Sequence, residues 1–409
     1  MNTNLMVAEE VHKRQKYLGE KGLIILIAFL SAFIPLSTDL YLPALPRMAD
    51  HFQAAPSLIN LTLILFFVFY AAASLLWGPL SDKYGRKPIL LVGLVIYTVT
   101  SALCASSGNV YQLIFFRILQ AIASGAATAV GQAIVKDSYS GQKRVSVLAV
   151  VSSMTMVSPI VAPVVGALIL RFTSWRGVFL TLAFIGFLIT CAVIVMEETI
   201  QERSTGSISQ SLGRLGIVAR NPGFMPLLLT LSLMGIPMMS FITSSSYIFV
   251  DQFGLSEQVY SYYFAANALF MVIGPLLYMK LAGSFKPTSL ITASYVIACI
   301  SGLCISTIGI HGPLIFTLSL IPATLAGSIT RPPSANLMLE QQKGDTGAVV
   351  SLMSFAFTVF GCIGMVIISL GWANLVWVMG LMYMVFALLS LVFWSRVSKK
   401  SYVLKVKFK

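Results

Sequence analysis

The sequence predicts an all-α polytopic membrane protein with twelve transmembrane helices in two six-helix bundles. Hydrophobic residues make up 57% of the 409 positions and charged residues only 10%, and the mean hydropathy is +0.88. A soluble globular chain carries about 25% charged residues, so a soluble fold fits poorly. Apolar windows of about 20 residues, the length that crosses a bilayer, also recur along the whole chain.

The apolar windows give the boundaries of the expected helices. The run that begins at Gly22 is too long for a signal-peptide core and follows a lead of mixed charge, so it is expected to remain as the first helix. An even number of spans places both termini on the same side of the membrane. The windows cover 22–43, 57–79, 89–107, 111–134, 145–170, 177–196, 223–249, 258–279, 288–310, 313–335, 347–370 and 373–395.

The lysines and arginines predict which side faces the cytoplasm. Loops and tails assigned to the inside carry most of these cations, whereas the outer loops carry only Arg47, Arg171 and Arg176. Cytoplasmic loops are enriched in Lys and Arg, so both termini are expected in the cytoplasm. The same distribution accounts for the net charge of +13 without nucleic acid as a partner, because the cations lie in short loops between apolar spans.

A hydrophilic stretch in the middle of the sequence divides the chain into two halves. Lys87-Pro88 before the third span is echoed by Lys286-Pro287 before the ninth, which suggests parallel halves around one central cavity. The expected units are a cytoplasmic tail at 1–21, a six-helix bundle at 22–196, a cytoplasmic linker at 197–222, a second bundle at 223–395 and a basic cytoplasmic tail at 396–409.

A charged island at 78–88 separates the second and third spans. Its glycines permit a close turn between two helices. Asp82 can pair with Lys83 or with Arg86, and its cations hold the loop on the cytoplasmic side. A generic basic loop is the alternative interpretation.

One acid and one matching cation stand out inside the expected spans. Of fourteen acids, only Asp39 cannot be placed in a loop, a tail or a span end. A charge at mid-membrane costs roughly 2.5 to 3.5 kcal/mol, so Asp39 is the candidate proton carrier. Arg117 is the matching cation. The two form either a permanent structural ion pair or, as we favour, a functional pair in which the arginine keeps the carboxylate ionised until substrate or a conformational change loosens it.

Arg117 also begins a small, polar stripe. Steps of three and four residues from it reach Gln120, Ser124 and Thr128, which share one face of a helix. Such a face is expected to point into the bundle or toward water, away from lipid.

The span at 145–170 contains helix-breaking residues on one face. Pro159, Pro163 and Gly166 are spaced by four and three residues, so two interruptions of the hydrogen-bond ladder and one small residue coincide. A bent, closely packed helix at a moving seam is one interpretation. Ordinary membrane packing by small residues and prolines is the other.

The wall of the expected substrate cavity is drawn from polar, aromatic and methionine positions, because such side chains repack around varied ligands. For each of them, contact with lipid or core packing is the alternative. The candidates are Asn60, Tyr70, Gln120, Ser124, Met154, Met238, Met239, Tyr247, Asn267 and Phe270.

Metal sites and enzyme activity find no support in the sequence. The five cysteines all lie inside spans, and no pair of the three histidines has ligand spacing. An enzyme would need several acids, histidines or a nucleophile grouped at one interface, and a channel would show a repeated filter or charged rings. Neither pattern is present, so the expected cofactor set is empty apart from the proton.

Several motifs resemble those of the major facilitator superfamily. The island matches its loop of the form G-x-L-x-D-x-x-G-R-K at Gly78, Leu80, Asp82, Gly85, Arg86 and Lys87. The run 35–46 is similar to the first helix of the Bcr/CflA group of drug:proton antiporters, named for bicyclomycin and chloramphenicol resistance. The run 113–125 resembles a further superfamily motif, with Ala121 where glycine is usual. The motif G-P-x-x-G-G is approximated around Pro163, with Ala162 and Ala167 replacing its outer glycines.

The resemblance implies an antiporter of the bacterial inner membrane that functions as a monomer. Two bundles would rock about a midplane site, and protonation of Asp39 from outside would drive export of small, largely apolar drugs. Asp82 with Arg86 would latch the cytoplasmic ends of the bundles in the outward-open state. An exporter of one endogenous metabolite, for example a siderophore, would share every one of these motifs and stays the alternative.

Overall fold

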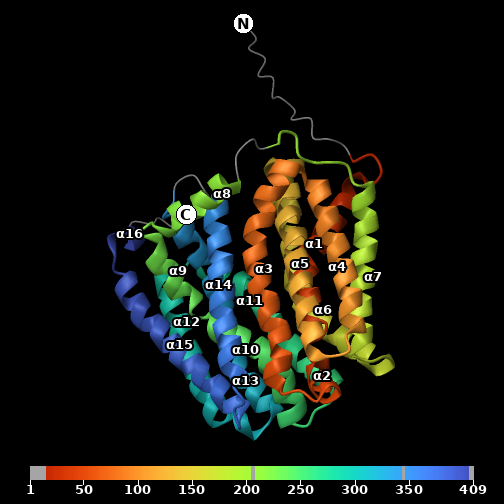
Figure 1. Ribbon diagram of the computed structural model, residues 1–409. Coiled ribbons are helices and arrows are strands. Elements are labelled where there is room, and N and C mark those ends of the chain that lie inside the picture. Colours follow the sequence, from red (N-terminus) through yellow and green to blue (C-terminus); the bar gives the residue numbers. More distant parts are fainter. Residues whose placement is uncertain (1–14, 204–207, 343–345, 405–409) are drawn as a thin grey trace.

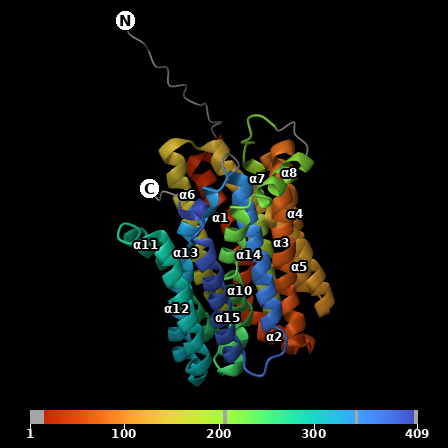
Figure 2. The ribbon, with the colours of Figure 1, turned by 90° about the vertical axis from the view of Figure 1, so that its left-hand side faces the viewer.

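The computed structural model describes residues 15–203, 208–342 and 346–404. Within these ranges there is no strand, and twelve spans are long and apolar enough to cross a membrane. They run side by side in both views (Figures 1 and 2). The predicted all-α, twelve-helix fold class is therefore confirmed. Parts of the expected tails and linker, at 1–14, 204–207 and 405–409, lie outside the described residues.

The first six spans pack mainly with one another. Within this set α5 packs against α3 and α4, α4 packs against α7, and α1 packs against α5 and α6. The helices are α1 (Gly19–Asp39), which continues through η1 (Leu42–Ala44) into α2 (Leu45–Phe52), then α3 (Pro56–Tyr84), α4 (Arg86–Ser106), α5 (Val110–Ser138), α6 (Gly141–Phe172) and α7 (Trp175–Val195). Several of them extend beyond the apolar windows, because helix continues into polar ends that a hydrophobicity window omits.

The last six spans form the second half. Its tightest pairs are α12 with α15, α12 with α13, α10 with α14 and α11 with α13. The helices are α9 (Phe224–Ser232), α10 (Gly235–Ser246) with the π-helical turn η2 (Tyr247–Gln252), α11 (Glu257–Leu281), α12 (Pro287–Thr307), η3 (Gly309–His311), α13 (Pro313–Leu339), α14 (Thr346–Ile368), α15 (Leu375–Val397) and the short α16 (Ser401–Leu404). The linker between the halves contains the helix α8 (Ile208–Ala219).

The seventh span is interrupted between α9 and α10. Pro237 has no N–H to donate to the carbonyl of Leu233, four residues earlier. The N–H of Ile236 donates to that carbonyl instead, at 3.1 Å. The sequence therefore replaces one continuous helix with two shorter helices that meet at a tightened turn.

The two ends of the molecule differ. The start of α1 and the end of α15 lie at the end that carries α8, which we call the linker end, and α2 lies at the opposite, far end (Figure 1). One buried apolar cluster near the far end contains residues of both halves, including Leu63 and Met365. Toward the linker end the core splits into two clusters, one for each half.

Polar contacts also join the halves near the far end. Arg47 Nε lies 2.5 Å from Glu257 Oε1, and Asn60 Nδ2 donates to Ser369 Oγ at 2.8 Å. The helices α6 and α11, and α3 and α14, pack across the same boundary. We call these contacts the far-end seam. Among the described residues, the halves are therefore held together at the far end.

Candidate functional site

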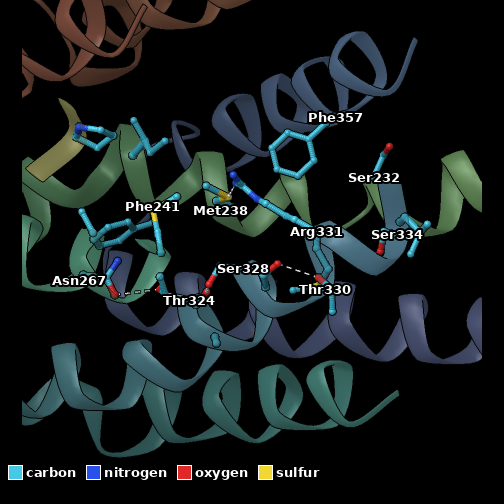
Figure 3. Close-up of a pocket in the computed structure, with 18 of the residues that line it drawn as sticks. Ser232, Met238, Phe241, Asn267, Thr324, Ser328, Thr330, Arg331, Ser334 and Phe357 are labelled. Atoms are coloured by element: carbon cyan, nitrogen blue, oxygen red, sulfur yellow. Dashed lines mark hydrogen bonds between the residues drawn. The ribbon is translucent and has the colours of Figure 1, made fainter. Parts of the chain in front are cut away.

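A cavity of about 370 Å³ lies between the halves, and the second half supplies most of its wall. Most of these side chains come from α10, α11, α13 and α14, with others from α9 and α15. Many are apolar, including Phe264 and, in Figure 3, Phe241 and Phe357. The first half contributes Asp39 and Pro159. The lining residues of α14 lie in the part of that helix nearer the linker end. The cavity therefore extends from the middle of the molecule toward the linker end, away from the far-end seam.

Asp39 is the last residue of α1 and forms part of the cavity wall. Its side chain is buried, and the hydroxyl of Thr38 donates a hydrogen bond to Oδ1 at 2.9 Å. The structure thus places the one acid that the sequence singled out at a cavity between the halves.

Arg117 does not pair with Asp39. Its guanidinium is fully buried and donates to the carbonyl of Ser37 at 3.1 Å and to Gln120 Oε1 at 2.6 Å. It also lies 4.2 Å from the ring centroid of Phe66. The expected ion pair is absent from this conformation, because backbone carbonyls, an amide and aromatic rings already surround the cation.

The polar stripe that follows Arg117 faces the interior of the first half. Gln120 Nε2 donates to Ser101 Oγ at 2.6 Å, between α5 and α4. Ser124 is buried and donates to the carbonyl of Ala121 in its own helix. The stripe is directed away from lipid, as expected. However, neither Gln120 nor Ser124 lines the cavity.

Of the ten residues expected at the cavity wall, Met238 and Asn267 line this cavity, and Asn267 Oδ1 accepts a hydrogen bond from Thr324 at 2.9 Å. The other eight lie elsewhere, because residue type does not reveal which face of a helix meets the cavity. Besides Gln120 and Ser124, they are Asn60 in the far-end seam, Tyr70 bonded to Thr128, Met239 packed near Gly361, Tyr247 in the shared core, and the half-buried Met154 and Phe270.

The helix α6 approaches α1 closely at Gly166. A Cβ added at Gly166 would overlap the carbonyl oxygen of Leu40 and lie 2.8 Å from its carbonyl carbon. Pro163 is buried, and Pro159 lies at the cavity wall. The expected face of α6 thus contacts the end of α1 at Gly166 and reaches the cavity at Pro159. The same helix also packs against α11 of the other half.

We expect Gly166→Ala to lower the thermal stability of the detergent-purified protein. The added methyl group meets backbone atoms that cannot rotate away, and such overpacking costs about 1 to 3 kcal/mol. Gly216→Ala is the matched control, because Gly216 is helical and a Cβ there meets nothing within 4 Å. Equal unfolding temperatures for the two variants would contradict the close approach of α6 to α1.

The loop between α3 and α4 consists of one residue, Gly85, with φ +106°. A Cβ there would lie 2.6 Å from a carboxylate oxygen of Glu198. That carboxylate accepts hydrogen bonds from the backbone N–H groups of Arg86 at 3.0 Å and Lys87 at 3.1 Å. These donors at the start of α4 have no partner within the helix, and a negative charge is favourable there. Glu198 therefore anchors the start of the linker on this loop.

The side chain of Arg86 connects three helices of the first half. Its Nη1 lies 2.6 Å from Asp82 Oδ1, and its Nε lies 2.7 Å from Asp137 Oδ2. Of the two cations that the sequence offered to Asp82, Arg86 is the one that pairs with it. These contacts stay within one half, so a latch between the halves in the outward-open state remains a prediction.

Arg331 was not predicted as a site residue. It lies within the expected span at 313–335, and the structure places it on α13 at the cavity wall, beside Met238 and Phe357 (Figure 3). The signal was the one that identified Asp39, a charge inside an apolar span. A count of acidic residues within the spans does not include this cation.

The family model of the Major Facilitator Superfamily matches residues 27–365. The chain belongs to this superfamily. It is therefore a transporter and not an enzyme, as the sequence predicted. The island at 78–88 and the twelve spans agree with that membership.

Three bacterial relatives have sequences that match half or more of this superfamily protein. An MFS-type transporter, YdgK of Bacillus subtilis, is 28% identical over 349 residues, which cover 84% of this chain and 87% of YdgK. A bicyclomycin resistance protein homolog of Haemophilus influenzae is 24% identical over 290 residues, covering 68% of this chain and 71% of the relative. The multidrug resistance protein MdtM of Salmonella typhimurium is 31% identical over 229 residues, covering 56% and 55%. The predicted resemblance to resistance exporters is confirmed.

Solved structures of other transporters share the fold. A bacterial homolog of the human lysosomal transporter Spinster, in an inward-facing and unoccupied conformation, gives a TM-score of 0.78 at 15% identity, covering 95% of this chain and 98% of that one. A D-xylose–proton symporter gives 0.72 at 13% identity, covering 91% and 97%. At these identities the likeness is one of fold alone.

Proposed function

We propose that this superfamily member is a proton-coupled antiporter that exports small, largely apolar drugs or toxic compounds by alternating access. The observation that carries the proposal is the position of Asp39, an acid on the wall of a mostly apolar cavity between the halves. The names of the relatives support drugs as cargo. The proposed setting is the bacterial inner membrane, with a monomer whose termini are both cytoplasmic.

The described conformation suits the loading of cargo from the cytoplasm. The cation distribution supports a cytoplasmic position of the linker end, and the cavity extends toward that end while the far-end seam is closed. Rocking of the halves would separate Arg47 from Glu257 and Asn60 from Ser369, and would open the cavity to the outside. In that state the loop around Asp82 and Arg86 would close the cytoplasmic side.

Asp39 would exchange a proton once in each cycle. In the outward-open state its carboxylate takes a proton from the outer solution, and in the inward-open state the carboxylic acid releases it to the cytoplasm. Cargo binds best to one of these two forms, so proton entry and cargo exit are tied to one group. The hydroxyl of Thr38, 2.9 Å from Oδ1, orients the carboxyl group for both steps.

Proteoliposomes with an imposed pH difference test this function directly. The liposome interior is acidified. Transporters whose cytoplasmic side faces the external buffer should then carry a fluorescent drug into the liposomes, and the interior pH should rise as the drug accumulates. Collapsing both the pH difference and the voltage with ionophores should reduce accumulation to the level of protein-free liposomes. Uptake at full rate after that collapse would exclude proton coupling.

A further inference from the structure

Arg331 is a cation of the cavity wall, and its partners in the described part of the chain are neutral. Its Nη2 donates to the sulfur of Met238 at 3.1 Å, and its guanidinium carbon lies 5.5 Å from the ring centroid of Phe357 (Figure 3). Among the residues that the structure describes, no carboxylate forms an ion pair with it. This positive charge inside a membrane span thus has no ionic compensation from the described part of the protein.

Two other arginines, Arg86 and Arg117, have oxygen acceptors that Arg331 lacks among the described residues. Arg86 pairs with the carboxylates of Asp82 and Asp137. Arg117 is enclosed, and it donates to two backbone carbonyls and the amide oxygen of Gln120. A guanidinium carries five N–H donors, and the one hydrogen bond assigned to Arg331 goes to a thioether, which is a weak acceptor. Its remaining donors are available to a molecule in the cavity.

We propose that Arg331 binds a carboxylate of the cargo, so that the preferred cargo joins an apolar body to one acidic group. A planar guanidinium matches a carboxylate with two parallel hydrogen bonds, and the interaction is strong where water is partly excluded. Phe241, Phe264 and Met271 supply apolar surface for the body of such a molecule in the same cavity. This inference rests on the proposed function, because it takes the cavity to be the cargo site.

The carboxyl group of Asp39 lies at a different depth of the cavity from Arg331, so it does not exclude an anionic cargo there. Asp39 is the last residue of α1, the end of that helix that points away from the linker end. Arg331 lies eight residues before the linker end of α13, so about 12 Å of helix separates it from that end. The two groups form no ion pair, so Arg331 stays available to a ligand. A carboxylate held by Arg331 near the cytoplasmic mouth is therefore separated from the acid that would carry the proton.

Equilibrium dialysis of the detergent-purified, full-length protein tests the inference. The probes are three fluorescent pairs that differ only in the acidic group: dansylglycine, dansylphenylalanine and dansyltryptophan, each with its primary amide. We expect at least one acid to bind about ten- to a hundredfold more tightly than its amide, since a hydrogen bond to a charged group contributes that much affinity. Equal binding within all three pairs, or no binding of any acid, would overturn the inference.

Substitutions then assign the preference to one side chain. Arg331→Gln should reduce the affinity for the acid to that for the amide, and Arg331→Lys should retain part of the preference because it keeps the charge without the planar fork. Lys280→Gln, which removes an exposed cation at the linker end of the same half, should change neither affinity. A preference that persists in Arg331→Gln would overturn the assignment. If that variant does not fold, the comparison of wild type with Arg331→Lys decides.

The binding measurement needs no proton gradient, so its outcome is independent of the transport test. If proton-driven transport fails while the acid preference depends on Arg331, the antiporter mechanism is wrong and the binding site stands. If neutral drugs are transported while acids and amides bind equally, the acidic-cargo inference alone fails.

Discussion

Asp39→Asn should abolish transport driven by a pH difference while leaving the protein folded and inserted. The amide has nearly the same shape and retains an oxygen that accepts the hydrogen bond of Thr38. It cannot gain or lose a proton in the accessible pH range, so the proposed coupling step is removed. Drug accumulation in everted vesicles, driven by respiration, should fall to the level of vesicles without the protein.

Asp50→Asn is the matched control for that experiment. Asp50 is an exposed acid of α2 at the far end and takes no part in the cavity wall. Its variant should transport at the wild-type rate. Undiminished accumulation in Asp39→Asn would remove Asp39 from the mechanism, whatever the behaviour of the control.

Arg117→Ala should produce the largest loss of thermal stability among the arginine variants. It leaves the carbonyls of Ser37 and Thr62 and the amide of Gln120 without their buried donor, and it opens a cavity beside Tyr41. An unsatisfied buried polar group costs about 1 to 3 kcal/mol, so a loss of about 3 kcal/mol or more is expected. The unfolding temperature in detergent measures this loss.

Two comparisons distinguish a structural role of Arg117 from the ion pair expected from the sequence. Arg171→Ala, which removes an exposed arginine at the far end of α6, should leave the unfolding temperature unchanged. Arg117→Lys should keep the pH profile of transport if Arg117 acts by holding the first half together. A displaced pH profile at normal stability would show that Arg117 meets Asp39 in another conformation.

Membership of the superfamily was predictable because the motif at 78–88 is a short, continuous stretch of sequence, and the number of helices was predictable because it depends on local composition. The acid at Asp39 was predictable for the same reason, since its energetic cost within an apolar span is independent of its neighbours. The helix ends were less accurate. The helix α3 continues to Tyr84, past the apolar window, because its hydrogen-bond ladder extends to the turn at Gly85.

The cavity could not be read from residue types. Its wall depends on which faces of α10, α11, α13 and α14 point toward the first half, and on the relative positions of the halves in the described conformation. The neighbours of Arg117 could not be predicted from residue types either. The sequence predicted a pair with Asp39, but contacts with Tyr41 and Phe66 from other segments determine what the guanidinium of Arg117 meets.

In the proposed mechanism, the close approach of α6 to α1 would connect the protonation of Asp39 with a shape change over a very short distance. The residue whose carbonyl lies against Gly166 is Leu40, the direct neighbour of Asp39 along the chain. In turn α6 packs against α11 of the other half. A shift of the α1 end when its terminal acid is charged or discharged would press on the helix that borders the opposite half, so this transporter needs no extended relay. In the proposed cycle, the acid that takes up the proton and the carbonyl that lies against α6 therefore belong to adjacent residues.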